Sequence, residues 1–267
     1  MTTNERVTCT IEAGVAEVRL ARAAKHNGLD PAMFDAIVET GEALAKDKSV
    51  RAVVLAGDGP SFCAGLDWKS FLAGGEAVRS KLLDRPEGQL ANLAQRVGWI
   101  WTELPVPVIA AIHGACIGGG LQIALGADIR IVAPDATLAI REIVYGLIPD
   151  MSISATLTRL IPIDVAKELT WTGRDIDGRE AVALGLATRV SDTPLDDARA
   201  LAKTIAGHMP ETIRAGKQLW NQAPHLDPKA ALALETELQI PLVGSKNQME
   251  AVQARFMKRT PNFDDPA

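Results

Sequence analysis

The sequence predicts an α/β fold in which helices cover a largely parallel sheet and a helical region follows it. Three observations support this prediction. Short apolar runs typical of buried strands, at residues 51–56 and 106–112, alternate with segments of helical periodicity. Glycine-rich turns follow both runs, and almost every segment after Pro194 fits a helix. We therefore divide the 267 residues into an α/β core, residues 1–190, and a helical C-terminal region, residues 191–267.

The first elements follow from alternation and from helix-start signals. Residues 7–11 and 15–20 alternate apolar and polar side chains, which predicts a hairpin. Asp30 and Pro31 form an N-cap followed by proline at the first helical position, so a helix should begin there. The run 51–56 ends at residues 57–60, Gly-Asp-Gly-Pro, which predicts a buried strand followed by a loop.

A second unit of the same kind comes next. Residues 89–104 suit a helix that Pro105 ends, and residues 106–112 suit a buried strand. Residues 121–125 are compatible with a helix, and residues 129–132 with a return to strand. Strands that alternate with helices at this spacing indicate parallel pairing.

The chain then becomes mainly helical, from Ser152 onward. Asp177 and Glu180 match a capping box, in which the Asp side chain accepts a free amide and the Glu side chain reaches back. Gly185 should end this short helix, and residues 186–190 could rejoin the sheet. Later helices are interrupted by prolines.

Composition excludes several classes of function. The chain has 47% hydrophobic and 23% charged residues, which is typical of an ordinary globular protein. Its net charge of −5 argues against nucleic-acid and anionic-membrane partners, although a small anionic ligand remains compatible. No run approaches the ~20 apolar residues of a membrane span. Three cysteines without CxxC spacing, and no visible secretory signal, predict free thiols and a cytoplasmic location.

Two glycine-rich segments are the strongest candidates for chemistry. Residues 61–67 (SFCAGLD) and 113–122 (HGACIGGGLQ) each follow a predicted buried strand. Glycine at such a junction lets backbone amides approach a ligand. Neither segment has the spacing of a dinucleotide fingerprint or of a phosphate loop. The alternative is that the glycines only permit close packing of helix against strand.

An ordered set of motifs resembles the enoyl-CoA hydratase/isomerase (crotonase) family over most of the chain. Residues 24–29 (AKHNGL) are similar to its K-x-N-A-L segment, and residues 61–67 to its F-[CSA]-A-G-x-D segment. Residues 111–130 resemble its A-x-x-G-x-x-x-G-G-G…D-x-R block. The match continues in order through Glu142 with Gly146–Pro149 and Thr172–Arg174.

The resemblance implies a crotonase-like spiral core and an acyl-CoA thioester as substrate. Coenzyme A would then be part of the substrate, with no separate cofactor and no metal. The family's assembly implies a homotrimer or a dimer of trimers, with the C-terminal region making oligomer contacts and covering the site. The thioester carbonyl would lie between the backbone amides of Ala64 and Gly119, which would stabilise an enolate oxygen. The substrate-binding residues implied are Lys25, Ala64, Gly65, Leu66, Asp67, Gly118, Gly119 and Gln122.

Glu142 and Asp150 are the candidate acid/base residues. Glu142 falls at the position of the family's acid/base glutamate; the alternative is a surface charge beside Arg141. Gln122 stands where hydratases of the family have a second glutamate, so hydration by two carboxylates is in doubt. Asp150 resembles the aspartate of dienoyl-CoA isomerases; the alternative is that it caps a helix near Ser152.

The remaining candidates are expected to be structural. His113 should be packed or hydrogen-bonded rather than catalytic, and Cys63 and Cys116 should be packing residues rather than nucleophiles. Trp68 could either line an acyl pocket or fill the core. The predicted function is hydration of a 2-enoyl-CoA or double-bond isomerisation, such as that of a dienoyl-CoA. The alternatives are a thioester hydrolase and a catalytically silent acyl-CoA-binding protein.

Overall fold

The fold is built on a seven-stranded sheet. The computed structural model describes residues 2–3 and 5–266. The strand order is β1-β2-β3-β4-β5-β7-β9; β1, β2 and β3 pair antiparallel, and the pairs from β3 to β9 are parallel. The strands span β1 Thr2–Thr3, β2 Val7–Glu12, β3 Val15–Leu20, β4 Ala52–Gly57, β5 Val108–Ile112, β7 Ile129–Val132 and β9 Arg189–Val190. The predicted hairpin and the parallel pairing are thus confirmed, although β5 begins after Pro107 because proline cannot donate to the ladder.

Successive residues of the central strands enter two separate cores. In β4, Val53 and Leu55 belong to the larger core, whereas Ala52, Val54 and Ala56 belong to the smaller one. Because side chains alternate across a strand, these cores lie on opposite faces of the sheet. Both faces are covered, which explains why the strand reads as a continuous apolar run.

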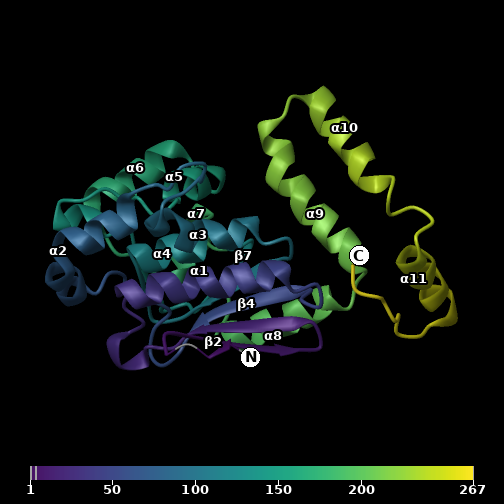
Figure 1. Ribbon diagram of the computed structural model, residues 1–267, viewed down its shortest axis with the longest axis horizontal. Coiled ribbons are helices and arrows are strands. Elements are labelled where there is room, and N and C mark those ends of the chain that lie inside the picture. The colour runs from purple at the N-terminus through teal and green to yellow at the C-terminus, as the bar shows by residue number, and fades with distance from the viewer. Residues whose placement is uncertain (1, 4, 267) are drawn as a thin grey trace.

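Helices cover both faces of the sheet. α1 (Pro31–Lys46) and α3 (Leu93–Glu103) pack against each other, and α1 also contacts β2. α8 (Pro194–Ala206) packs against β4, β5 and β7, where its buried Ala198 and Ala202 meet the small side chains of the second core (Figure 1). Hence α8, which lies within residues 191–267, is part of the layered core.

Helix starts follow local capping, with two differences from the predictions. The Asp30 side chain accepts a hydrogen bond from Met33 N at 2.9 Å, so the predicted N-cap of α1 is confirmed. α3 begins at Leu93 rather than at residue 89, because Asn92 and Gln95 form a capping box there. At α7 (Gly178–Leu184) the capping box is only half formed: Asp177 accepts from Glu180 N, but the Glu180 carboxylate pairs with Arg174.

The remaining elements lie around the carboxyl ends of the central strands and in the C-terminal region. β6 (Ala115–Ile117) and β8 (Thr137–Ala139) form a separate parallel pair. The other helices are α2 (Trp68–Leu83), α4 (Gly119–Leu125), α5 (Ile153–Thr156), α6 (Ile163–Thr172), α9 (Pro210–Gln222), α10 (Pro228–Gln239) and α11 (Lys246–Met257). The 3₁₀ turns are η1 (Ala23–Lys25), η2 (Glu142–Tyr145), η3 (Leu157–Arg159) and η4 (Ala223–His225).

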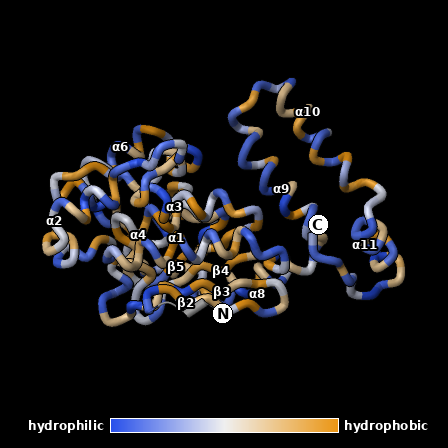
Figure 2. The backbone as a smooth tube through the Cα atoms, viewed as in Figure 1, coloured by the Kyte–Doolittle hydropathy of each residue, from blue (hydrophilic) through white to orange (hydrophobic). Residues whose placement is uncertain are grey.

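Helices α9, α10 and α11 form an arm that projects beside the core (Figure 1). Lys217 anchors α9: its Nζ donates to the carbonyl oxygens of Trp101 and Val106 at 2.9 and 3.0 Å and pairs with Asp128 at 2.8 Å. Apolar residues recur along the arm (Figure 2), and several large ones are exposed, among them Trp220, Leu232, Ile240, Val243 and Phe256. Within the described ranges, none of the helices is long and apolar enough to cross a membrane.

Candidate active site

The two glycine-rich segments lie together around a cavity of about 70 Å³. We call residues 61–67 the first loop and residues 113–120 the second loop. Two backbone hydrogen bonds join the loops: Cys63 N donates to Ala115 O at 2.9 Å, and Ile117 N donates to Cys63 O at 3.0 Å. The cavity is lined by Ala64, Gly65, Leu66, Trp68, Ile117, Gly118, Gly119, Arg141, Glu142, Tyr145 and Leu147.

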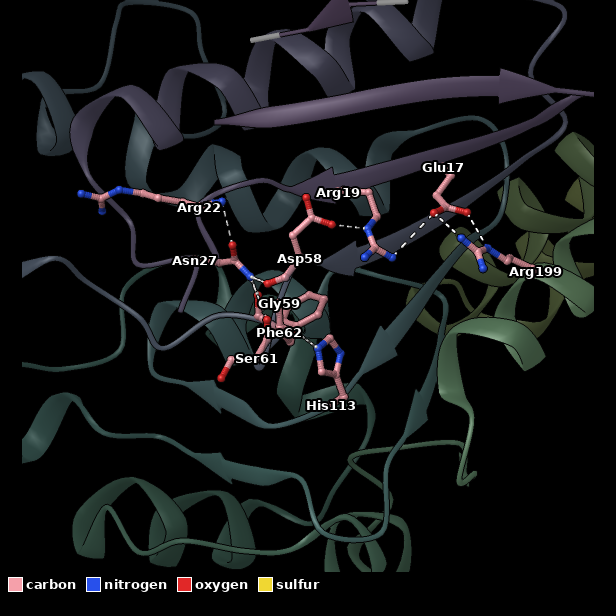
Figure 3. Close-up of polar contacts among 10 residues, drawn as sticks. All are labelled: Glu17, Arg19, Arg22, Asn27, Asp58, Gly59, Ser61, Phe62, His113 and Arg199. Carbon is pink, nitrogen blue, oxygen red and sulfur yellow. Dashed lines mark hydrogen bonds and ion pairs between the residues drawn. The ribbon is translucent and has the colours of Figure 1, made fainter. Parts of the chain in front are cut away.

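Asn27 holds the first loop in place. Its fully buried Nδ2 donates to the carbonyl oxygens of Asp58, Ser61 and Phe62 at 2.9, 2.8 and 3.1 Å (Figure 3). Its Oδ1 accepts from Arg22 N at 2.9 Å. The sequence placed Asn27 in a family motif but gave no role for it, because its partners are carbonyl groups more than thirty residues away.

Histidines support the same loop. His113 Nε2 lies 2.9 Å from the carbonyl oxygen of Gly59 (Figure 3), which confirms that this residue is hydrogen-bonded. His26 Nδ1 lies 2.9 Å from Ser61 Oγ. His26 therefore joins the first loop to the segment after β3, and His113 joins the start of the second loop to the turn before the first.

Glycine is required where the loops touch. Gly65 has φ +87°, and a Cβ atom there would lie 2.8 Å from the carbonyl oxygen of Ile117. A Cβ atom at Gly120 would lie 2.3 Å from the carbonyl oxygen of Cys63. Close packing therefore explains these two glycines, and it brings the backbone amides of both loops to one cavity.

The available backbone donors are those of Leu66 and Gly119. Within residues 2–3 and 5–266, neither N–H has an acceptor, and both residues line the cavity. The prediction that Ala64 supplies a donor is wrong for this structure, because Ala64 N donates to the carbonyl oxygen of His26 at 2.9 Å. Ala64 contributes to the cavity wall instead.

Glu142 is buried beside these donors. It begins the turn η2, is 8% exposed, and its Oε1 accepts from Gln122 Nε2 at 2.6 Å. Its Oε2 is buried and has no partner among the residues described. Burial raises the pKa of the Glu142 carboxyl above its usual range. The alternative of a surface charge beside Arg141 is therefore excluded.

Gln122 lies behind the carboxylate rather than facing the cavity. It is 1% exposed, and its Oε1 accepts from Met151 N at 2.8 Å while its Nε2 donates to Glu142. It is absent from the cavity wall. Direct contact between Gln122 and a substrate, as predicted, is not supported by this position.

Asp150 is accessible to solvent and lies outside the cavity wall. Partial burial of its carboxyl group raises the pKa of Asp150, and its negative charge helps to raise the pKa of Glu142. Asp150 does not cap a helix, since α5 has Ser152 as its N-cap and no side-chain cap bond. Asp150 thus acts on Glu142 through its charge.

The charged residues near the first loop have different roles. Asp67 caps α2, with its carboxylate accepting from Ser70 N at 3.4 Å, and pairs with Arg22 at 2.8 Å. The hydrogen bond from Arg22 lowers the pKa of Asp67. Asp67 therefore orients the chain leaving the loop. Lys25 is exposed on η1, where its predicted contact with coenzyme A stays a prediction.

The cysteines are packing residues, as expected. Cys63 and Cys116 are both fully buried. Burial raises the pKa of the Cys63 thiol to about 12, and that of Cys116 well above its ordinary value. A thiol that stays protonated is a poor nucleophile. In the part of the chain that the structure describes, no group of three or more His, Cys, Asp or Glu side chains could hold a metal.

An aromatic pair forms one side of the cavity. Trp68 begins α2 and Tyr145 ends η2; their ring centroids are 4.5 Å apart. Trp68 therefore lines the pocket rather than filling the core. Tyr145 was missed in the sequence, because nothing in its local pattern places it opposite Trp68.

Comparisons with known proteins agree with this geometry. A family model described as enoyl-CoA hydratase/isomerase matches residues 10–266. The human mitochondrial methylglutaconyl-CoA hydratase is 31% identical over 257 residues, which cover 94% of this chain and 74% of the relative. The human mitochondrial enoyl-CoA hydratase domain-containing protein 2 is 30% identical over 259 residues, covering 94% and 86%.

Solved structures give the same fold. The crystal structure of an enoyl-CoA hydratase from Bacillus anthracis superposes with a TM-score of 0.85 at 29% identity, covering 97% of this chain and 98% of that one. An enoyl-CoA hydratase from Mycobacterium tuberculosis H37Rv gives 0.84 at 27%, covering 98% and 99%. The predicted crotonase-like fold is therefore confirmed, and the chain belongs to the enoyl-CoA hydratase/isomerase family.

Proposed function

We propose that this protein holds the thioester carbonyl of an acyl-CoA between Leu66 N–H and Gly119 N–H and moves a proton with Glu142. One observation carries the proposal: a single cavity is lined by two backbone donors without acceptors and by a carboxyl group with one unpartnered oxygen. Removing a proton beside a thioester places negative charge on the carbonyl oxygen. Two fixed N–H groups stabilise that charge, each by about 3–4 kcal/mol.

Glu142 has the properties of a general base for this step. Its buried position raises its pKa toward neutrality, which lets one carboxyl group both accept and return a proton. In its ionised form, Oε2 takes a proton from the carbon next to the thioester. The electron pair moves onto the carbonyl oxygen.

We propose double-bond isomerisation as the reaction that this arrangement favours. Oε2 would return the same proton to a carbon farther along the conjugated system, so that no water is consumed. Gln122 supports this choice, because both polar ends of its amide are already engaged by protein groups. Gln122 is also 1% exposed and is absent from the cavity wall, so its side chain is not placed to hold an attacking water there.

Hydration of a 2-enoyl-CoA is the second candidate. The names of the relatives favour it, since several are called hydratases. Asp150, whose pKa is raised and whose charge helps to raise the pKa of Glu142, is a second carboxyl group that could assist. Thioester hydrolysis and ligand binding without turnover are further outcomes that the same experiment separates.

We also propose that residues 191–267 make contacts between copies in a homotrimer or a dimer of trimers, and that coenzyme A is bound only as part of the substrate. The exposed apolar side chains of the arm support the first statement, because such patches usually mark contact surfaces. Sedimentation equilibrium tests the assembly, and a stable monomer at micromolar concentration would contradict it.

Mass spectrometry distinguishes the reactions. The protein is incubated in D₂O with 3-enoyl-, 2-enoyl- and dienoyl-CoA, and products are analysed beside those of Glu142→Gln and of the exposed-site control Gln253→Met. Isomerisation yields products with no added water and with deuterium incorporated to the extent that the abstracted proton exchanges. Hydration adds one molecule of D₂O and leaves one deuterium bound to carbon, and hydrolysis releases free coenzyme A. Full activity in Glu142→Gln would refute the proposed role of Glu142.

A further inference from the structure

We propose that Gln122 is a positioning residue that occupies Oε1 of Glu142 and so reserves Oε2 for proton transfer. This inference rests on the proposed function. It concerns a residue whose side chain does not line the cavity and would not touch the substrate.

The orientation of the Gln122 amide is fixed by its partners. Met151 N–H can only donate, so the group facing it at 2.8 Å must be the amide oxygen. The amide nitrogen therefore faces Glu142 Oε1, at 2.6 Å. Reversing the amide would set two donors against each other at Met151 and two acceptors against each other at an ionised Glu142.

The contact also fixes the direction of the free oxygen. With Oε1 held by Gln122, the carboxylate plane can no longer rotate freely, and Oε2 is left buried with no partner among the described residues. The carboxylate lies against the second loop at Gly118: a Cβ atom there would be 3.1 Å from Oε1 and 3.8 Å from Oε2. Oε1 is thus hydrogen-bonded to Gln122, and Oε2 is available to a substrate.

The same helix carries the backbone donor and the positioning amide. α4 begins at Gly119, which lines the cavity and whose N–H has no acceptor among the described residues, and Gln122 lies about one turn later. The Met151 side chain packs against the start of this helix, since a Cβ atom at Gly119 would be 2.8 Å from its Sδ. Gln122 therefore links the donor at Gly119 to the base Glu142 through one rigid element.

Two substitutions test this role. Gln122→Met keeps the size of the side chain but removes the donor to Oε1. Gln122→Glu keeps a donor only while the new carboxyl group is protonated. The other charged groups near Glu142 are Asp150, which raises its pKa, and Arg141, which is paired with Asp175; all three stay unchanged in both variants.

The measurement is the pH profile of kcat/KM for the substrate that the wild type turns over. Since a hydrogen bond to an ionised group favours the ionised form, Gln122→Met should move the acidic limb upward by about one pH unit. Gln122→Glu should retain activity at low pH, where the two adjacent carboxyl groups share one proton. At higher pH they lose this proton, so the profile should acquire a descending limb. Gln253→Met, on the exposed surface of α11, should leave the profile unchanged.

Two results would overturn the inference: an unshifted acidic limb in Gln122→Met, or the absence of a descending limb in Gln122→Glu. Thermal unfolding of each variant shows whether it is folded. If Gln122→Met does not fold, Gln122→Glu decides alone. The failure of the proposed function looks different, because Glu142→Gln would then retain turnover whatever the Gln122 variants do.

Discussion

Replacing Gly118 by alanine should displace the Glu142 carboxylate. Gly118 has φ +53° and ψ −119°, a conformation that residues other than glycine rarely adopt, so the backbone strain should destabilise the fold by about 1–3 kcal/mol. The new methyl group would also lie 3.1 Å from Glu142 Oε1, tighter than ordinary contact. Because Oε1 is already held by Gln122, the carboxylate must shift as a unit. Since a misplacement of about 1 Å can cost about 10²-fold, this smaller shift should lower kcat by about 10-fold.

The assay combines chemical unfolding with steady-state turnover of the substrate identified by mass spectrometry. Gly88→Ala is the matched control: Gly88 also has positive φ, +77°, but a Cβ atom there would have no neighbour within 4 Å. It should lose about 1–2 kcal/mol of stability and keep its turnover. A folded Gly118→Ala variant with kcat within about twofold of the wild type would refute the claim that this carboxylate position matters.

Three further predictions follow from the same site. Asn27→Ala should destabilise the protein by about 3 kcal/mol, measured by urea unfolding, because the carbonyl groups of Asp58, Ser61 and Phe62 lose their donor; an unchanged midpoint would contradict this. Trp68→Ala should raise kcat/KM for longer acyl chains relative to shorter ones, because it removes the ring packed against Tyr145 at the cavity wall; an unaltered chain-length preference would count against it. In the wild type, kcat/KM should rise with pH through a pKa above 4.5, since Glu142 must lose its proton to act as a base and burial raises its pKa; a flat profile would exclude Glu142 as that base.

The core strands could be predicted from sequence because each is short, apolar and followed by turn residues. Val53 to Ala56 fill two opposite cores, so every residue is apolar and the strand is recognisable as a continuous apolar run. The helix at Trp68–Leu83 was not predicted. Gly74 and Gly75 interrupt it, Gly75 has non-helical dihedrals, and only Leu82 is buried along its length, so apolar periodicity is weak.

Local motifs place residues of the candidate site, but they do not reveal the hydrogen-bond partners of those residues. Glu142 and Gly119 were placed by their motifs, and the structure brings both to one cavity. Ala64 was the wrong choice of donor, because whether an N–H is free depends on a partner elsewhere, here the carbonyl group of His26. The loss of a second glutamate was visible at Gln122, but its contacts with Glu142 and Met151 arise only when α4, η2 and the turn before α5 meet.

The decisive measurement is a crystal structure with a bound acyl-CoA analogue in which a methylene group replaces the thioester sulfur, because the resulting ketone keeps the carbonyl oxygen but cannot be hydrolysed. We expect the carbonyl oxygen to lie about 3 Å from both Leu66 N and Gly119 N, with the adjacent carbon facing Glu142 Oε2. A carbonyl oxygen bound to neither nitrogen, or an acyl group turned away from Glu142, would contradict it.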